Sequence, residues 1–314
     1  MVSEVLADWI NQSVNKHIDE QSTMKKIGFI GLGIMGKPMA LNLIKAGYAL
    51  NVLKSSSAAS ELESNGAKLF ESSKAVAENS DVVITMLPDS PEVKKVVFGV
   101  EGVYEGIRSG TVFVDMSTIA PSAAREIYDR LQEKGVEAID APVSGGQVGA
   151  ETGNLSIMCG GNQQAFEAVL PLFQVMGKSA VLIGDAGAGQ MTKACNQMIV
   201  GMTIQAVSES FTLAKKAGVD LAKMREALLG GFAQSRILDL HGQRIIDRNF
   251  NPGFKIKLHR KDMNIALEAG KEFSVPLYGS ALVASHMDAL LALGNGEKDH
   301  SSIALLMEKL SGLE

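Results

Sequence analysis

Short apolar runs alternate with helical stretches between Met24 and about Asp185. Runs of four or five apolar, often β-branched residues between turn-forming residues are typical of strands. They predict strands at residues 27–30, 50–53, 82–86, 112–116, 137–141, 155–159 and 180–183. A helix is predicted over residues 39–46, where Gly47 ends it. Because strands alternate with helices and several strands are apolar throughout, we expect a parallel sheet that is buried on both faces.

The pattern changes after Gly189, where helical periodicity continues and strand signals stop. A long helix is predicted over residues 191–217, since only Gly201 interrupts it before Gly218. Shorter helices are predicted at residues 221–229, 236–247, 260–272, 278–293 and 300–311. We therefore expect an α/β domain over residues 24–187 and an all-α domain over residues 188–314, which starts with the long helix.

Residues 1–23 are expected to be an N-terminal extension, because a new pattern opens at Met24. Their apolar residues fall near helical spacing: Val5, Leu6, Trp9, Ile10, Val14 and Ile18. A short amphipathic helix and a disordered tail both remain open for this segment.

Charge and cysteine usage narrow the partners and the compartment. The net charge of −5 disfavours nucleic acid and anionic membranes as partners. No apolar run reaches the length of about 18 residues that a membrane span needs, and the N-terminus lacks the features of a signal peptide. Two cysteines favour a reducing compartment, so a cytoplasmic location is expected. The five histidines lack metal-binding spacing, so we expect no metal site.

The first predicted strand is followed by a G-x-G-x-x-G motif, made of Gly31, Leu32, Gly33, Ile34, Met35 and Gly36. The first glycine permits a tight turn, the second lets backbone approach a pyrophosphate, and the third lets the helix pack close to the strand. The helix N-terminus then faces the phosphates with unpaired N–H groups. This context predicts a Rossmann-type, doubly wound dinucleotide-binding domain.

The end of the second predicted strand bears on the choice of cofactor. An acidic residue at this position would accept the ribose 2′-hydroxyl of NAD, but the sequence has Lys54 and Ser55 there. Lys54 can hold a 2′-phosphate, so NADPH is the expected cofactor, with NADH left open. Met86, Leu87 and Pro88 follow the strand at 82–86 and are expected to line the cofactor.

Two further segments carry candidate substrate chemistry. Ser144, Gly145 and Gly146 offer a hydroxyl and unshielded backbone N–H groups, an arrangement that suits a carboxylate. Lys193 lies early in the long apolar helix, where a buried amine could donate a proton to a carbonyl oxygen. By pattern alone, a lysine that extends from the helix end to solvent is an equally good interpretation. Asn196 and Gln197 follow on nearly the same helix face and could orient Lys193 or the substrate.

Six segments in this order resemble the β-hydroxyacid dehydrogenase family, which includes 3-hydroxyisobutyrate dehydrogenase: GFIGLGIMGKPMALNL, ITMLPDSPEV, VDMSTIAP, DAPVSGG, GAGQMTKACNQ and FKIKLHRKDMNIA. The resemblance covers residues 24–312. It implies hydride transfer between a nicotinamide cofactor and a small carboxylate-bearing aldehyde or hydroxy acid. It also implies that the long helix joins the two domains and that the all-α domain over residues 188–314 is the substrate and oligomerisation domain. The expected assembly is a homo-oligomer, a dimer or tetramer. The branch that it favours reduces tartronate semialdehyde to glycerate.

The resemblance also implies roles for individual residues. Lys193 matches the family's catalytic lysine, and Ser144, Gly145 and Gly146 match its carboxylate loop. Ser117 and Thr118 match positions near the nicotinamide and the substrate. The C-terminal segment that closes over the site matches at Phe254, Lys261 and Asp262, with Lys261 near the cofactor.

Several alternatives remain open. The same motifs suit reduction of glyoxylate or succinic semialdehyde, or oxidation of 3-hydroxyisobutyrate. A non-catalytic dinucleotide-binding module is disfavoured by Lys193 together with the carboxylate loop, and an imine reductase is disfavoured by Lys193. Two positions depart from the family pattern: Gln197 where many members have asparagine, and Lys54-Ser55 where relatives often have an acidic or amide residue before arginine. Arg236 is more consistent with a surface ion pair than with a substrate contact.

Overall fold

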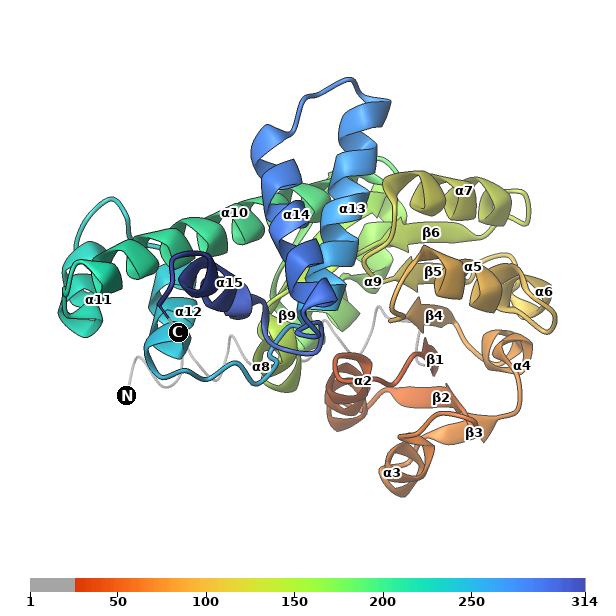
Figure 1. Ribbon diagram of the computed structural model, residues 1–314. Coiled ribbons are helices and arrows are strands. Elements are labelled where there is room, and N and C mark those ends of the chain that lie inside the picture. The colour runs from red at the N-terminus through yellow and green to blue at the C-terminus, as the bar shows by residue number, and fades with distance from the viewer. Residues whose placement is uncertain (1–25, 314) are drawn as a thin grey trace, which may run out of the picture. The chain divides into compact units, whose positions relative to one another are not determined.

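The computed structural model describes residues 26–313 (Figure 1), so the predicted extension at 1–23 lies outside the described residues. The chain divides into two compact units. The first unit ends at Gln190 and the second begins at Met191. Helix α10 (Ala188–Lys216) crosses this division.

Within its described residues, the first unit is built on one nine-stranded sheet with the order β3-β2-β1-β4-β5-β6-β8-β7, and β9 pairs with β8. The strands are β1 (Lys26–Ile30), β2 (Ala49–Leu53), β3 (Lys68–Phe70), β4 (Val82–Thr85), β5 (Val112–Asp115), β6 (Glu137–Asp140), β7 (Val143–Ser144), β8 (Leu155–Gly161) and β9 (Gly177–Gly184). The first six strands are parallel, whereas β8 runs antiparallel to β6 and β7. The order 3-2-1-4-5-6 confirms the predicted Rossmann-type, doubly wound sheet.

Two hydrophobic cores lie on opposite faces of this sheet, because successive side chains of a strand point to opposite faces. Ile27, Phe29 and Ile84 contribute to one core, while Ile30 and Val83 contribute to the other. Helices α2 (Gly36–Lys45), α3 (Ala59–Ser64), α8 (Gly146–Glu151) and α9 (Gln163–Met176) cover the first face. Helices α4 (Ser73–Glu78), α5 (Ser90–Phe98), α6 (Val103–Gly106) and α7 (Pro121–Gln132) cover the second face (Figure 1).

The topology determines where this unit can bind a ligand. β1 lies between β2 and β4, so the connections that leave β1 and β4 diverge to opposite sides. In an open α/β sheet, ligands bind outside the carboxyl ends of the strands at such a switch point. The loops that follow β1, β4 and β5 are therefore the positions at which to look for a site.

The second unit is helical. Its elements are the greater part of α10, then α11 (Leu221–Leu229), α12 (Arg236–Ile246), α13 (Ile256–Glu272), α14 (Tyr278–Ala292), the 3-10 helix η1 (His300–Ser302) and α15 (Ile303–Leu310). α13 and α14 run side by side (Figure 1) and share a core with Ile204 and Ile303. No helix within residues 26–313 combines the length and apolarity needed to cross a membrane.

Candidate functional site

The glycine motif forms the turn between β1 and α2, and its backbone geometry requires two of its glycines. Gly31 has a φ of +102°, and a Cβ there would lie 2.2 Å from the carbonyl oxygen of Met86. A Cβ on Gly36 would lie 1.9 Å from the carbonyl oxygen of Gly31. Neither position can carry a side chain without displacing backbone. The motif therefore packs the start of α2 against β1 and the segment after β4.

Gly33 differs, because a Cβ at this position would meet no atom within 4 Å. Gly33 is exposed, and the first turn of α2 contains no acidic residue. Within the described chain no side chain caps the N-terminus of α2. The N–H of Lys37 donates to the carbonyl of Gly33 and Pro38 has no N–H, so an anion at this end of the helix would meet the N–H groups that precede Lys37. Open space over Gly33 beside a helix N-terminus is the cradle that a dinucleotide pyrophosphate needs. Leu32 is buried beneath this loop, while Ile34 is 56% exposed above it.

Hydrogen bonds join the loops that follow β4 and β5. The Ser117 hydroxyl accepts from the N–H of Leu87 at 2.8 Å, and Thr85 donates to Asp115 at 2.8 Å. Ser117 is fully buried, whereas Thr118, Met86 and Leu87 are half-buried and Pro88 is exposed. The structure thus brings the predicted residues Met86, Leu87 and Ser117 together beside the glycine loop.

Lys54, after β2, forms an ion pair with Glu71, with 2.7 Å between Lys54 Nζ and Glu71 Oε1. Both side chains are mostly exposed, and the hydrogen bond to Glu71 raises the pKa of Lys54. Exposed pairs of this kind contribute little to stability, so an incoming anion can compete for the lysine. Ser55 is also exposed. Glu71 follows the short strand β3, which the sequence pattern did not predict.

Ser144 ends β7, and Gly145 and Gly146 open α8. Gly145 has a φ of +139° and Gly146 a φ of +62°, so two successive residues have backbone conformations that favour glycine. Both glycines are exposed and Ser144 is half-buried. The loop therefore presents backbone and a hydroxyl to solvent, as a carboxylate-binding site requires.

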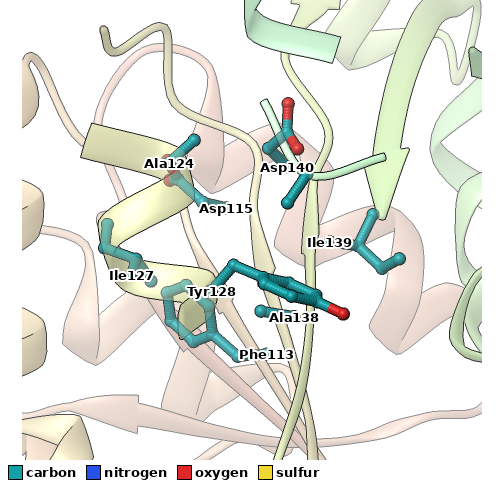
Figure 2. Close-up of a pocket in the computed structure, with 9 residues that line it drawn as sticks. Phe113, Asp115, Ala124, Ile127, Tyr128, Ala138, Ile139 and Asp140 are labelled. Atoms are coloured by element: carbon teal, nitrogen blue, oxygen red, sulfur yellow. The ribbon is translucent and has the colours of Figure 1, made fainter. Parts of the chain in front are cut away.

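The start of α10 is held by Asp140, the last residue of β6. Its carboxylate accepts from the N–H groups of Gly187 at 2.7 Å and Gln190 at 2.8 Å. Burial raises the pKa of Asp140 to about 6, although these N–H groups favour the carboxylate; the charge of Asp115 adds to the rise. Asp115 and Asp140 are register partners at the ends of β5 and β6, beside a cavity of about 10 Å³ (Figure 2). That volume holds one water molecule at most.

Gln190 links the first turn of α10 to the loop after β5. Its side-chain oxygen accepts from the N–H of Ile119 at 3.0 Å, and its amide donates to the carbonyl of Ser117 at 2.8 Å. Gln190 is 1% exposed, so both bonds are shielded from water. The helix that carries Lys193 is therefore fixed at its first turn by side-chain bonds inside the first unit.

Lys193 lies in the second unit and is 6% exposed. Its amine donates to the side-chain oxygen of Gln197 at 3.1 Å. Asn196 donates to the same oxygen at 2.7 Å, and the Gln197 amide donates to Asp262 at 2.6 Å. Lys261 pairs with Asp262 at 2.9 Å. The structure therefore joins five of the predicted residues in one polar network, in which Lys193, Gln197 and Asp262 are buried.

Burial lowers the pKa of Lys193 to about 8. The charge of Asp262 opposes this shift and the charge of Lys261 adds to it. An amine with this pKa is mostly protonated at neutral pH, yet it gives up its proton more readily than an exposed lysine. These are the properties of a general acid that works near neutrality.

Phe254 precedes α13, and its N–H donates to Asp299 at 3.1 Å. The Phe254 ring lies 5.8 Å from the ring of His259, between centroids.

Arg236, at the start of α12, is exposed. Cys159 is buried in β8, whereas Cys195 is exposed.

Comparison with known proteins identifies the family. Residues 26–184 match the model of the NAD binding domain of 6-phosphogluconate dehydrogenase, and residues 187–307 match that of the NAD-binding region of NADP-dependent 3-hydroxyisobutyrate dehydrogenase. The chain belongs to the 3-hydroxyisobutyrate dehydrogenase-like β-hydroxyacid dehydrogenases. This confirms the resemblance read from the motifs.

Three relatives illustrate the similarity. The chain is 46% identical to 2-hydroxy-3-oxopropionate reductase of Escherichia coli, covering 91% of this chain and 98% of that protein. It is 38% identical to 2-(hydroxymethyl)glutarate dehydrogenase of Eubacterium barkeri, covering 92% and 96%. The solved structure of Mycobacterium tuberculosis 3-hydroxyisobutyrate dehydrogenase with L-serine has a TM-score of 0.84 at 30% identity, covering 91% and 99%. This β-hydroxyacid dehydrogenase is thus an NAD(P)-dependent oxidoreductase acting on CH–OH groups, and its cofactor is NAD(P)H.

Sequence reasoning assigned no role to Asp140, Gln190, Glu71 or His259. Asp140 and Gln190 stand inside the quoted motifs DAPVSGG and GAGQMTKACNQ, so their presence there was the available signal. Their bonds join residues that are 47 to 73 positions apart, which a local pattern does not reveal. Glu71 was missed because β3 has three residues and too little periodicity to be recognised.

The carboxylate of Asp140 should stabilise the start of α10. Asp140→Ala leaves two N–H groups at the buried start of α10 without an acceptor, and it should lower the free energy of unfolding by about 2–4 kcal/mol. Chemical denaturation measures the change. The control is Asp129→Ala, at an exposed position on α7, which should change stability by less than about 0.5 kcal/mol. Equal losses in the two variants would show that Asp140 does not hold the helix.

Proposed function

We propose that this dehydrogenase reduces tartronate semialdehyde (2-hydroxy-3-oxopropionate) to glycerate, with Lys193 as the general acid. The observation that carries the proposal is the buried amine of Lys193, which is bonded to Gln197 and has a lowered pKa. The similarity to the E. coli 2-hydroxy-3-oxopropionate reductase supports this choice of substrate.

The chemistry requires one hydride and one proton. NAD(P)H held at the glycine loop would supply the hydride, and the carbonyl oxygen of the aldehyde would gain negative charge. In our proposal the Lys193 ammonium donates its proton to that oxygen, which becomes the hydroxyl of glycerate, and Lys193 is left neutral. Gln197 keeps the amine in place from the next turn of α10, because its amide is held in turn by Asp262.

The remaining predicted residues have consistent roles in this proposal. Ser144, Gly145 and Gly146 would bind the substrate carboxylate through a hydroxyl and backbone N–H groups. Asn196 and Phe254 would complete the substrate contacts, with Thr118 and Lys261 near the cofactor. Ser117 and Asp262 are buried and already bonded, to Leu87 and Gln197, so they would instead support the site from behind. The glycine loop Gly31–Gly36 would hold the pyrophosphate, and Met86, Leu87 and Pro88 would line the cofactor.

We further propose that NADPH is the preferred cofactor. Lys54 is an exposed cation just after β2, where the 2′-phosphate of NADPH is bound in such domains. Its present partner, Glu71, is exposed and held by a single ion pair. A phosphate with two negative charges would compete successfully with one carboxylate for the lysine.

A panel of aldehydes tests the substrate. Tartronate semialdehyde, glyoxylate and succinic semialdehyde are compared through the loss of NADPH absorbance. Tartronate semialdehyde should lead by at least tenfold in kcat/KM, or about 1.4 kcal/mol of transition-state free energy. A lead by glyoxylate or succinic semialdehyde would leave the family assignment in place and overturn the proposed substrate.

The pH profile tests the role of Lys193. Reduction needs the protonated amine, so kcat/KM for the aldehyde should fall above about pH 8, while oxidation of glycerate should rise through the same pKa. Lys193→Ala should lower kcat by about 10²–10⁴-fold and leave NADPH affinity nearly unchanged. Lys271→Ala, at an exposed position on α13, is the control. Full activity in Lys193→Ala would exclude the proposed general acid.

The cofactor preference is tested on the pair after β2. Lys54→Ala should lower kcat/KM with NADPH by about tenfold and leave the value with NADH nearly unchanged, because one charge-assisted contact to the 2′-phosphate is lost. Glu71→Gln should shift the NADPH/NADH ratio upward, because Lys54 loses its competing partner. Lys45→Ala, exposed at the end of α2, controls for general loss of positive charge. A wild-type preference for NADH would contradict the proposal.

A further inference from the structure

Three histidines of the second unit form a chain of hydrogen bonds that begins at the residue beside Lys193. His259, on α13, lies with Nε2 3.1 Å from the backbone carbonyl oxygen of Gln197. His259 Nδ1 lies 3.0 Å from Nδ1 of His300. His300 Nε2 lies 3.2 Å from Nε2 of His241. His259 and His300 are buried, and His241 is 17% exposed at its side chain.

The chain has a direction, because a carbonyl oxygen can only accept. His259 must carry its proton on Nε2, so its Nδ1 is the acceptor when the ring is neutral. His300 must then donate from Nδ1 and accept at Nε2, and His241 must donate from Nε2. Each neutral imidazole has one donor and one acceptor, so the carbonyl of Gln197 determines the tautomers of His259 and His300 in turn.

Two features favour this arrangement: the close approach of His259 to α10 and the neutral state of the buried rings. Gly201 lies one turn beyond Gln197, and a Cβ there would lie 3.4 Å from both Cε1 and Nε2 of His259, so glycine gives the ring close access to the helix. Burial lowers the pKa of His259 and lowers that of His300 further, which keeps both rings neutral at neutral pH. Neutral rings are the condition for the directed chain.

His241, Asp299 and His300 are also close enough to share a metal ion. The Asp299 carboxylate, however, already accepts from the N–H groups of Gly253, Phe254 and Ser301 and from the Ser301 hydroxyl. The guanidinium of Arg244 lies 3.6 Å from the same carboxylate and would repel a cation. The donor set therefore fits a hydrogen-bonded chain better than a metal centre.

We propose that His259 is a positioning residue for Lys193, holding the backbone of α10 at Gln197, and that His300 and His241 fix the tautomer in which His259 can do so. The proposal rests on the proposed role of Lys193 as the general acid. The side chain of Gln197 bonds Lys193 while its backbone carbonyl bonds His259, so one residue connects the amine to the histidine chain.

Protonation of a buried ring would break the chain of hydrogen bonds, because a second proton on His259 or His300 would bring two N–H groups face to face. The Nδ1 atom of His241 lies outside this chain of bonds, 3.6 Å from a carboxylate oxygen of Asp299. The other charged groups that face the chain are Asp262, Lys193 and Arg244. Because folding lowers the pKa of His259 and His300, their contribution to stability is complete above the ordinary value of 6.5 and is lost as pH falls below it.

Histidine ¹⁵N NMR of the full-length wild-type protein at pH 7.5 tests the tautomers without any loss of folding. We expect His259 to carry its proton on Nε2 and His300 on Nδ1, the less common form of free neutral histidine. The opposite tautomer at either ring would overturn the proposal. So would stoichiometric zinc that remains after dialysis against EDTA, because the chain would then be a metal site.

Kinetics of variants test the effect on Lys193. His300→Phe removes the donor to His259 and should lower kcat about tenfold, equivalent to about 1.4 kcal/mol, with KM nearly unchanged and with a displaced alkaline limb in the pH profile. His300→Gln retains an N–H donor and should recover most of the rate and the wild-type limb. His286→Phe, on α14 and outside the chain, should leave both unchanged.

The outcomes separate the two proposals. If Lys193→Ala is inactive while His300→Phe keeps the wild-type rate and pH profile, the positioning role is wrong and the general acid stands. If Lys193→Ala is fully active, the general acid fails and the positioning role fails with it, whatever tautomers NMR finds.

Discussion

A lysine amine with 6% of its surface exposed loses most of its hydration, and the loss is tolerated only where polar groups replace the water. Lys193 meets this requirement through Gln197, which is held by Asp262 at its amide and by His259 at its backbone carbonyl. The network keeps the amine charged at neutral pH and in one place. The proposed chemistry, the lowered pKa and the packing of α13 against α10 all depend on this burial.

Buried polar groups at the N-terminus of α10 also need partners, and the first unit supplies them. Asp140 accepts from two N–H groups at the start of α10, and the Gln190 side chain bonds the loop after β5, whereas among the described residues no side chain caps the N-terminus of α2. A helix N-terminus that is satisfied internally can hold structure, whereas one that is left open can hold an anion. Capping therefore distinguishes α10, whose N-terminus is held in place, from α2, whose N-terminus is open to a ligand.

The sequence was sufficient for the architecture, because parallel strands such as Val82–Thr85 are continuously apolar and G-x-G-x-x-G follows directly from β1. The sequence also predicted that Lys193, Asn196 and Gln197 lie on one helix, because the three residues are close together in the chain. It missed β3 and β7, which have three and two residues. The histidine chain could not be predicted, because His241, His259 and His300 come from three elements separated by turns, and their spacing in sequence follows no metal-binding or helical rule.

The titratable groups around α10 work together over a limited pH range. Lys193 holds its proton below about pH 8, while Asp140 is ionised above about pH 6. His259 and His300 are neutral throughout that interval, because burial lowers the pKa of each below the ordinary 6.5. A protonated acid, an ionised helix cap and a directed chain of neutral rings therefore coexist only near neutrality. Each shift arises chiefly from burial, so the same packing that forms the fold also determines the pH range in which the proposed acid can work.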